Sequence, residues 1–364
     1  MNHPYYTPAD LPPEPPAEPT PPDGAGPDDV KQHFSRLGLA YLILTVGVGT
    51  ASYATTLAVR ALCPSLLTSW WFIWFLSLVP LYAVALPLLW LCLRRIPTSP
   101  HDPRKTMDGV TVDNPPFGAP RWFSLLIISF GCMVVGSLAG NYVMSLLSAV
   151  TGHDYASSLS VAIDTTPPWF TLLCTCILGP LGEELLYRKL LIDRTRRFGD
   201  KTSILLSGIL FGLFHFNLFQ FFYATMVGVI LAYVYTRTGK YLLCVAMHAV
   251  YNLVGSVMIP ALSRLMAPLT DPALPEELLS GSFALADLTD LIPAFLAMMV
   301  LLIWQYGSLI VAIILLVRNF RRTALAAGEI PTADRPELPW LNPGMIACIL
   351  VMLAILVSNL IPPL

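Results

Sequence analysis

The segment WFTLLCTCILGPLGEELLY, from Trp169 to Tyr187, decides the fold class of this chain. It is nearly as long and apolar as a helix that crosses a bilayer, which takes about 20 apolar residues. Similar runs recur along the chain at Leu37–Val59, Trp70–Leu93, Trp122–Val150, Ser203–Phe216, Leu218–Thr236, Tyr241–Leu262, Leu288–Val317 and Leu341–Ile361. We therefore predict an all-α, polytopic transmembrane helix bundle of eight or nine helices.

The count depends on Ser203–Phe216, which is short for a crossing. It is either a re-entrant segment or a crossing surrounded by protein and not by lipid. The distribution of basic residues favours a crossing. Without a crossing at Ser203–Phe216, the later basic loops would move to the opposite side of the membrane from the earlier ones.

Composition agrees with a membrane protein. Hydrophobic residues make up 55% and charged residues 12%, against roughly 25% charged in a soluble globular protein. Mean hydropathy is +0.66. The net charge of -2 gives no sign of a nucleic-acid partner, and the seven scattered cysteines do not form a disulfide framework.

Two regions differ in composition. Residues 1–35 are rich in proline and acids and are predicted to be a disordered cytoplasmic tail. Residues 36–364 form the predicted transmembrane bundle. With nine crossings and a cytoplasmic N-terminus, every basic residue except Arg60 and Arg264 falls on the cytoplasmic side. This asymmetry is the one that the positive-inside rule expects.

Ionisable residues are costly inside a bilayer, so those within the apolar runs are candidates for function. Glu184 and Arg188 are four residues apart, in the order that favours an ion pair on one helix face. We expect Arg188 to fix Glu184, and Glu183, about 100° away, to be the free general base. Pro180 should loosen this helix, because it cannot donate to the carbonyl of Cys176. The alternative is that both acids only balance the basic loop that follows.

Two histidines and an asparagine complete the polar set. His248 and Asn252 are four residues apart on one helix face, whereas His215 lies on another helix. A single membrane histidine more often packs than reacts, but two with an amide and a glutamate pair favour a site. At 1.5 Å per residue, Glu183, His215, His248 and Asn252 lie about 10–18 Å from the basic loops. The sequence therefore predicts one cavity, open to the cytoplasm.

Other catalytic patterns are missing from the sequence. There is no H-E-x-x-H zinc helix and no G-x-S-x-G nucleophile turn. Cys174 and Cys176 are two apart on a helix, so they point to opposing faces and cannot jointly hold a metal.

Three motifs resemble one family. Glu183-Glu184-Leu-Leu-Tyr-Arg188 matches E-E-x-x-x-R, Phe211 to His215 matches F-x-x-x-H, and His248 to Asn252 matches H-x-x-x-N. In this order they resemble the CPBP family, the CAAX proteases and bacteriocin-processing enzymes also called Abi proteins. The resemblance covers about residues 169–262. Lys189 departs from it, since family members often carry glycine there, which puts local helix packing in doubt.

The resemblance implies an intramembrane endopeptidase similar to the type II CAAX prenyl protease. By analogy, Glu183 and His215 would activate a water molecule, and His248 and Asn252 would stabilise the oxyanion. Two alternatives stay open for the cofactor: a zinc ion on Glu183, His215 and His248, as in a metalloprotease, or water activation without metal.

The expected partners are membrane lipids and a peptide or protein substrate. A lipidated CAAX tail is the family's best-known substrate, and in a bacterium a peptide precursor or membrane protein would replace it. We expect a multi-pass protein of the bacterial cell membrane, or of the endoplasmic reticulum in a eukaryote. The alternative is a non-enzymatic membrane protein, such as a transporter subunit, a scaffold or a bacteriocin-immunity factor.

Overall fold

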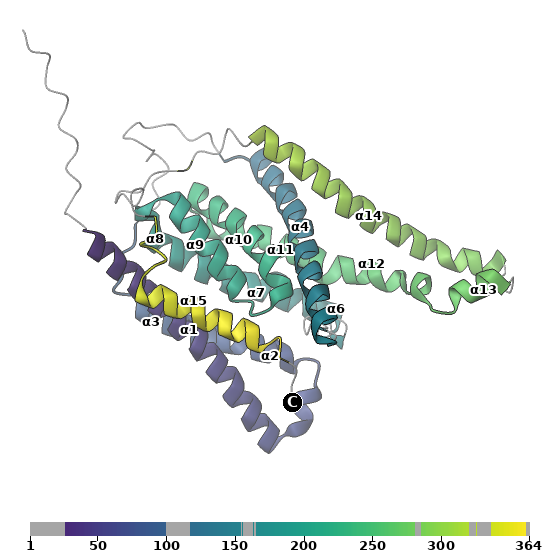
Figure 1. Ribbon diagram of the computed structural model, residues 1–364, viewed down its shortest axis with the longest axis horizontal. Coiled ribbons are helices and arrows are strands. Elements are labelled where there is room, and N and C mark those ends of the chain that lie inside the picture. The colour runs from purple at the N-terminus through teal and green to yellow at the C-terminus, as the bar shows by residue number, and fades with distance from the viewer. Residues whose placement is uncertain are drawn as a thin grey trace, which may run out of the picture.

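The computed structural model describes residues 26–99, 117–153, 155, 163, 165–280, 285–319, 325 and 336–361 (Figure 1). Within these residues the chain is helical and contains no strand. In the described part of the chain seven helices are long and apolar enough to cross a membrane, so the predicted polytopic bundle is confirmed.

The seven spans consist of one or more consecutive elements. They are α1 (Pro27–Leu62), α2 to α3 (Phe72–Leu93), α4 (Ala119–Thr151), α6 to η7 (Pro168–Phe198), α10 (Leu218–Thr238), α11 to α12 (Tyr241–Leu265) and the stretch Leu291–Arg318 of α14 (Leu285–Asn319). Two shorter helices, α9 (Asp200–Leu213) and α15 (Pro343–Ser358), pack among them. The remaining short elements are η2 (Pro64–Thr68), η9 (Ala267–Thr270) and α13 (Leu274–Ser280). We call the span Pro168–Phe198 the motif helix, because it carries the two glutamates.

The first helix begins earlier than predicted. α1 starts at Pro27, so residues 27–35 belong to the bundle and not to a tail. Proline suits the first helical position, and Asp28 and Asp29 favour the positive end of the helix dipole. Phe34 is fully buried in the core. Residues 1–25, the rest of the predicted tail, lie outside the described residues.

The short helix α9 is surrounded by protein. Its 14 residues rise only about 21 Å, less than the roughly 30 Å of a bilayer's hydrocarbon core. Most of its length is buried, including Ser207 and Leu210. A Cβ added at Gly208 would lie 2.5 Å from Val229 of α10, so the two backbones approach closely. Small residues permit this packing in membranes.

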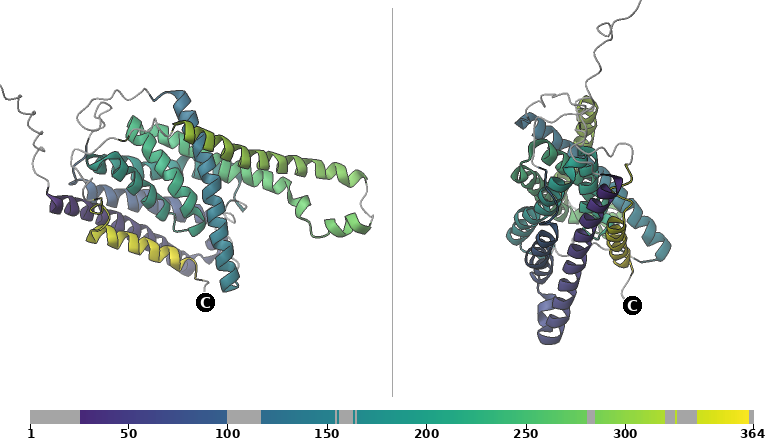
Figure 2. Two further views of the ribbon diagram at one scale, coloured as in Figure 1. Left: turned by 45° about the horizontal axis from the view of Figure 1, so that its top comes forward. Right: turned by 90° about the vertical axis from the view of Figure 1, so that its left-hand side faces the viewer.

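Contacts between helices fix their directions. His33 of α1 contacts Arg194 of the motif helix, and Tyr41 contacts Leu186, so these helices run antiparallel. α9 and α10 are antiparallel too, whereas α1 and α15 lie side by side and start at the same end (Figures 1 and 2). These directions fit nine successive crossings in which α9 is the fifth and α15 the ninth.

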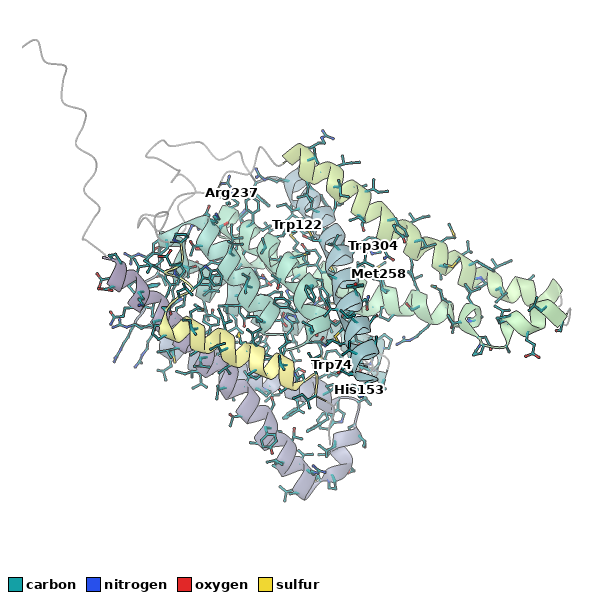
Figure 3. All side chains as sticks on the ribbon, viewed as in Figure 1. Trp74, Trp122, His153, Arg237, Met258 and Trp304 are labelled. Atoms are coloured by element: carbon teal, nitrogen blue, oxygen red, sulfur yellow. The ribbon has the colours of Figure 1, made fainter. Side chains whose placement is uncertain are left out.

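The bundle therefore has two ends, which we name for later use. The basic end is where α1, α4, α9, α11 and α15 begin and the motif helix and α10 finish. The far end is the opposite one. In Figure 3, Arg237 and Trp122 lie toward the basic end, whereas Trp74 and His153 lie at the far end.

Candidate active site

A wide turn shapes the motif helix just before its acids. The helix consists of α6 (Pro168–Thr171), the π turn η5 (Leu172–Leu178), α7 (Gly179–Glu184), the π turn η6 (Leu185–Leu190), α8 (Leu191–Thr195) and η7 (Arg196–Phe198). The N–H of Gly179 donates to the carbonyl of Cys174, five residues back. The loosening predicted from Pro180 is thus confirmed as a π turn.

The turn frees one carbonyl for a contact outside the helix. The carbonyl of Thr175 would need the N–H of Gly179, which Cys174 takes, or that of residue 180, which is proline and has none. Nδ2 of Asn252 donates to this carbonyl at 2.7 Å. Asn252 therefore joins α11 (Tyr241–Leu253) to the motif helix at the point that Pro180 opens.

Two other spans repeat the same pattern. The π turn η3 (Pro80–Ala85) ends two residues before Pro87, and η8 (Val254–Met258) ends two residues before Pro260. In each, the residue before proline donates its N–H five residues back. The common cause is the missing N–H of proline, which leaves upstream carbonyls without a donor and favours a wider turn.

The predicted ion pair is present and fully buried. Nε of Arg188 donates to Glu184 at 2.9 Å, and both side chains have 0% exposure. Nη1 of Arg188 donates to Oγ of Ser207 on α9 at 2.7 Å. The Ser207 hydroxyl in turn donates to the carbonyl of Tyr187 at 2.7 Å. The guanidinium is thereby held between the motif helix and α9.

Glu184 also receives a histidine. Nδ1 of His248 lies 2.9 Å from Oε1 of Glu184, and because a carboxylate only accepts, Nδ1 carries the proton. The other ring nitrogen, Nε2, lies 3.8 Å from Oε2 of Glu183. The side chains thus form a row from Arg188 through Glu184 and His248 to Glu183.

Glu183 differs from Glu184 in its surroundings. Its side chain is 25% exposed, against 0% for Glu184. His248 is its nearest basic group in the described part of the chain. Glu183 is therefore the carboxylate that has room for a further ligand, as its position on the helix predicts.

His215 follows the last turn of α9. Its Nδ1 lies 2.9 Å from the carbonyl of Phe211, which only accepts, so the proton sits on Nδ1. In the neutral ring Nε2 then carries a lone pair. No hydrogen bond or ion pair joins His215 to Glu183 among the described residues.

Phe211 holds the imidazoles and the guanidinium in one neighbourhood. Its ring centroid lies 4.9 Å from that of His215 and 5.7 Å from that of His248. The guanidinium carbon of Arg188 lies 4.8 Å from the same ring, in cation–π range. The structure therefore brings one side chain of each motif, Arg188, His215 and His248, around the ring of Phe211.

A cavity of about 1250 Å³ reaches this group. It extends between α4, α10, α12, α14 and α15. His215 and Asn252 line it, while Glu183 and His248 are not among its described lining residues. Trp304, labelled in Figure 3, forms part of its wall near the middle of α14.

The cavity lies nearer the far end of the bundle, whereas the sequence analysis expects the site nearer the basic loops. Much of its wall comes from the far-end parts of the helices, including Asn217 before α10 and Asn359 after α15. The motif helix also continues to Phe198, so Glu183 is at mid-length and not near the basic end. The depth estimate took this helix only to about Arg194, and it did not include the offset between helices.

Several contributing residues were missed by the sequence analysis. They are Ser207, Thr175, the π-turn residue Tyr82 and Tyr241. Hydroxyls of Tyr82 and Tyr241 donate to the motif-helix carbonyls of Leu178, at 2.5 Å, and Leu181. No local pattern marks these contacts. The F-x-x-x-H spacing did point to Phe211, though without a role.

The zinc ligands that the sequence predicts are Glu183, His215 and His248. No group of three or more His, Cys, Asp or Glu side chains in the described ranges is arranged to hold a metal ion. The set as placed therefore does not fit a three-ligand zinc site, and zinc stays a prediction.

Comparison with known proteins gives one finding. Residues 165–254 match the family model described as type II CAAX prenyl endopeptidase Rce1-like. The matched segment contains all three motifs and supports a CPBP, Rce1-like assignment. No curated protein and no solved structure matches the chain.

Proposed function

We propose that this protein is an intramembrane endopeptidase that hydrolyses a peptide bond with a water molecule activated by Glu183 and His215. The observation that carries the proposal is a row of four side chains inside a segment that matches an endopeptidase family. The row runs from buried Arg188, Glu184 and His248 to partly exposed Glu183. A buried ion pair alone would be weak evidence. The partly exposed carboxylate of Glu183, at the end of the row, is the feature that indicates catalysis.

Each residue has one role in the proposed reaction. Glu183 takes a proton from water, aided by the Nε2 lone pair of His215, and the hydroxide oxygen bonds to the scissile carbonyl carbon. The carbonyl oxygen becomes an oxyanion, which Asn252 and His248 would stabilise. Glu183 then gives its proton to the leaving nitrogen as the carbon–nitrogen bond breaks. The products are one carboxylic acid and one amine.

Glu184 and Arg188 act through His248. The guanidinium keeps Glu184 in place, and Glu184 fixes the ring of His248 through Nδ1. A carboxylate that orients an imidazole in this way is a common device in hydrolases. We class both as positioning residues, although the family resemblance includes them in its motif.

The first prediction concerns Glu183. We expect Glu183→Gln to abolish cleavage while expression and the melting temperature stay close to wild type, because the amide keeps the volume but cannot accept the proton. The measurement is hydrolysis of a quenched fluorogenic peptide library by purified protein in detergent. Glu276→Gln, on exposed α13, is the matched control and should cleave normally. Cleavage by Glu183→Gln at the wild-type rate would remove Glu183 from the mechanism.

The natural substrate can be sought in membranes. Proteomics would compare a strain carrying the wild-type protein with one carrying Glu183→Gln and score changed peptide C-termini. A membrane-associated peptide or protein, lipidated or not, should be truncated only in the wild type. If purified wild-type protein cleaves nothing and no terminus changes, the non-enzymatic alternative holds.

A second measurement decides the cofactor. Metal content of the purified protein is determined, and cleavage is followed before and after chelation. Water activation by side chains alone predicts unchanged activity in chelator and less than one zinc per chain. Loss of activity that added zinc restores would assign the site to a metalloprotease.

A further inference from the structure

A second, smaller pocket lies at the basic end of the bundle. Its volume is about 200 Å³, and its walls come from the first turns of α1, the segment after α3 and the end of the motif helix. Each of these segments contributes one arginine, namely Arg36, Arg95 and Arg197. We call this space the arginine pocket. It has room for a group several times larger than a water molecule, which takes about 30 Å³ in the liquid.

Contacts between the three segments hold the arginine pocket in shape. Nε2 of His33 on α1 donates to the carbonyl of Arg194 at 2.8 Å, and Nε of Arg194 donates to the carbonyl of Leu93 at 3.3 Å. The rings of His33 and Phe34 each lie 4.8 Å from that of Phe198. The pocket is therefore formed before any ligand arrives, and binding need not order its backbone.

The arginine pocket carries more positive than negative charge. Its one described acid is Asp29, whose carboxylate accepts the N–H of Gly26 at 3.1 Å. No ion pair joins Arg36, Arg95 or Arg197 to an acid within the described ranges. Nε of Arg197 is also buried without a hydrogen-bond partner in the part of the chain that the structure describes. Guanidinium groups around one small space repel each other, so an anion with several acceptor oxygens would stabilise the arrangement.

The depth of the arginine pocket indicates which anion reaches it. The apolar run of α1 begins at Leu37, directly after Arg36, and the apolar run of the second span ends at Leu93, two residues before Arg95. The pocket is therefore level with the lipid headgroups. Guanidinium groups bind phosphate through paired N–H donors. Anionic phospholipids present a phosphate at this depth, and a free phosphate in solution has the same chemistry.

From this arrangement we propose that the arginine pocket is a binding site for a phosphate group, at the depth where anionic phospholipids present one. The bound phosphate joins α1, the segment after α3 and the motif helix, and thereby stabilises the folded bundle. The site is separate from the proposed catalytic one, because none of the active-site residues is among its described lining residues. The proposal therefore does not depend on the endopeptidase function.

The test measures the melting temperature of the full chain in nonionic detergent. Three additions are compared at matched ionic strength: phosphatidylglycerol in the micelles, phosphatidylcholine in the micelles, and inorganic phosphate in solution. We expect a rise of about 5 °C with phosphatidylglycerol and none with phosphatidylcholine, whose choline brings a cation toward the arginines. An equal rise with inorganic phosphate assigns the site to the free anion, and a smaller one assigns it to the lipid. No rise with either phosphatidylglycerol or inorganic phosphate overturns the proposal.

Two double variants show whether the arginine pocket is responsible. The Arg36→Gln, Arg95→Gln variant changes two exposed pocket residues, so we expect it to fold and to lose the rise. The control, Lys31→Gln with Arg94→Gln, removes the same charge from the same two segments, at exposed positions outside the described lining. It should keep the full rise. Each rise is compared within one protein, so a difference in starting stability does not affect the result. Equal loss in both variants would indicate general attraction between the basic end and anions, and would overturn the pocket.

Discussion

Arg188 shows how much one residue does in this site. It is among the largest fully buried side chains, and it contacts Glu184, Ser207 and the ring of Phe211. A buried guanidinium is tolerated only when its charge and its donors are satisfied. The contact with Ser207 extends this requirement from the motif helix to α9. Single residues of the motifs therefore serve both the packing and the chemistry.

Breaking the buried ion pair should unfold the protein. Glu184→Gln or Arg188→Ala leaves an unpaired charge at 0% exposure, which costs about 3–5 kcal/mol. We expect loss of folded protein as well as of activity, measured by size-exclusion yield and melting temperature. Lys189→Ala, next to Arg188 but exposed, should behave like wild type. If Glu184→Gln and Arg188→Ala melt like wild type, the pair is not what supports the site.

Ser207 tests the link between the motif helix and α9. Ser207→Ala removes the partner of Nη1 of Arg188, and an unsatisfied buried donor costs about 1–3 kcal/mol. We expect a lower melting temperature and reduced activity. Ser203→Ala is the matched control, because the hydroxyl of Ser203 donates only to the carbonyl of Gly199 near its own helix. Equal effects of the two substitutions would contradict the proposed link.

At the scale of elements, prolines set the shape of the spans. The π turns η3, η5 and η8 each end two residues before a proline. In each, the residue before the proline donates its N–H to the carbonyl five residues back and not four. In the motif helix the shift exposes the Thr175 carbonyl, which Asn252 then binds. A helix defect thus becomes a contact point between two spans. The same defect positions the cavity-lining amide.

Pro180→Ala should separate stability from activity. The new N–H allows a regular α turn, so the Thr175 carbonyl no longer depends on Asn252. We expect a melting temperature at or above that of wild type and at least a tenfold loss of cleavage. Pro293→Ala, at an exposed position in α14, is the control and should leave cleavage unchanged. Wild-type cleavage by Pro180→Ala would show that the wide turn does not shape the site.

At the scale of the whole molecule, the first and last helices meet. Gly344 of α15 donates its N–H to Oγ of Ser35 on α1 at 3.0 Å. A Cβ added at Gly38 would lie 2.3 Å from the backbone nitrogen of Met345, so the helices touch through their backbones. Tyr41 of α1 in turn donates to the carbonyl of Leu186 at 2.6 Å. The helices α1 and α15, which lie outside the matched residues 165–254, therefore support the motif helix.

Gly38→Ala tests this closure. The added methyl group has no space against backbone atoms of α15, so we expect a lower melting temperature and reduced yield. Gly49→Ala, in the same helix but with no atom within 4 Å of the added Cβ, is the control. It should be neutral or stabilising by up to about 1 kcal/mol, because alanine favours helix. A Gly38→Ala protein as stable as Gly49→Ala would show that α15 docks elsewhere.

The sequence alone determined the helical membrane fold, the pairing of Glu184 with Arg188 and the distortion at Pro180. These follow from hydropathy, from the i,i+4 spacing and from the missing N–H of proline, all of which act over short stretches of chain. The three motifs likewise indicated the resemblance to the CPBP family before any geometry was known.

Only the tertiary structure decided which partners meet across helices and where the cavity lies. His248 meets Glu184 across 64 residues, and Asn252 meets Thr175 across 77. Such contacts depend on the offset and direction of packed helices, which hydropathy does not encode. The position of the cavity along the bundle follows from the same offsets, which counting residues along single helices does not include.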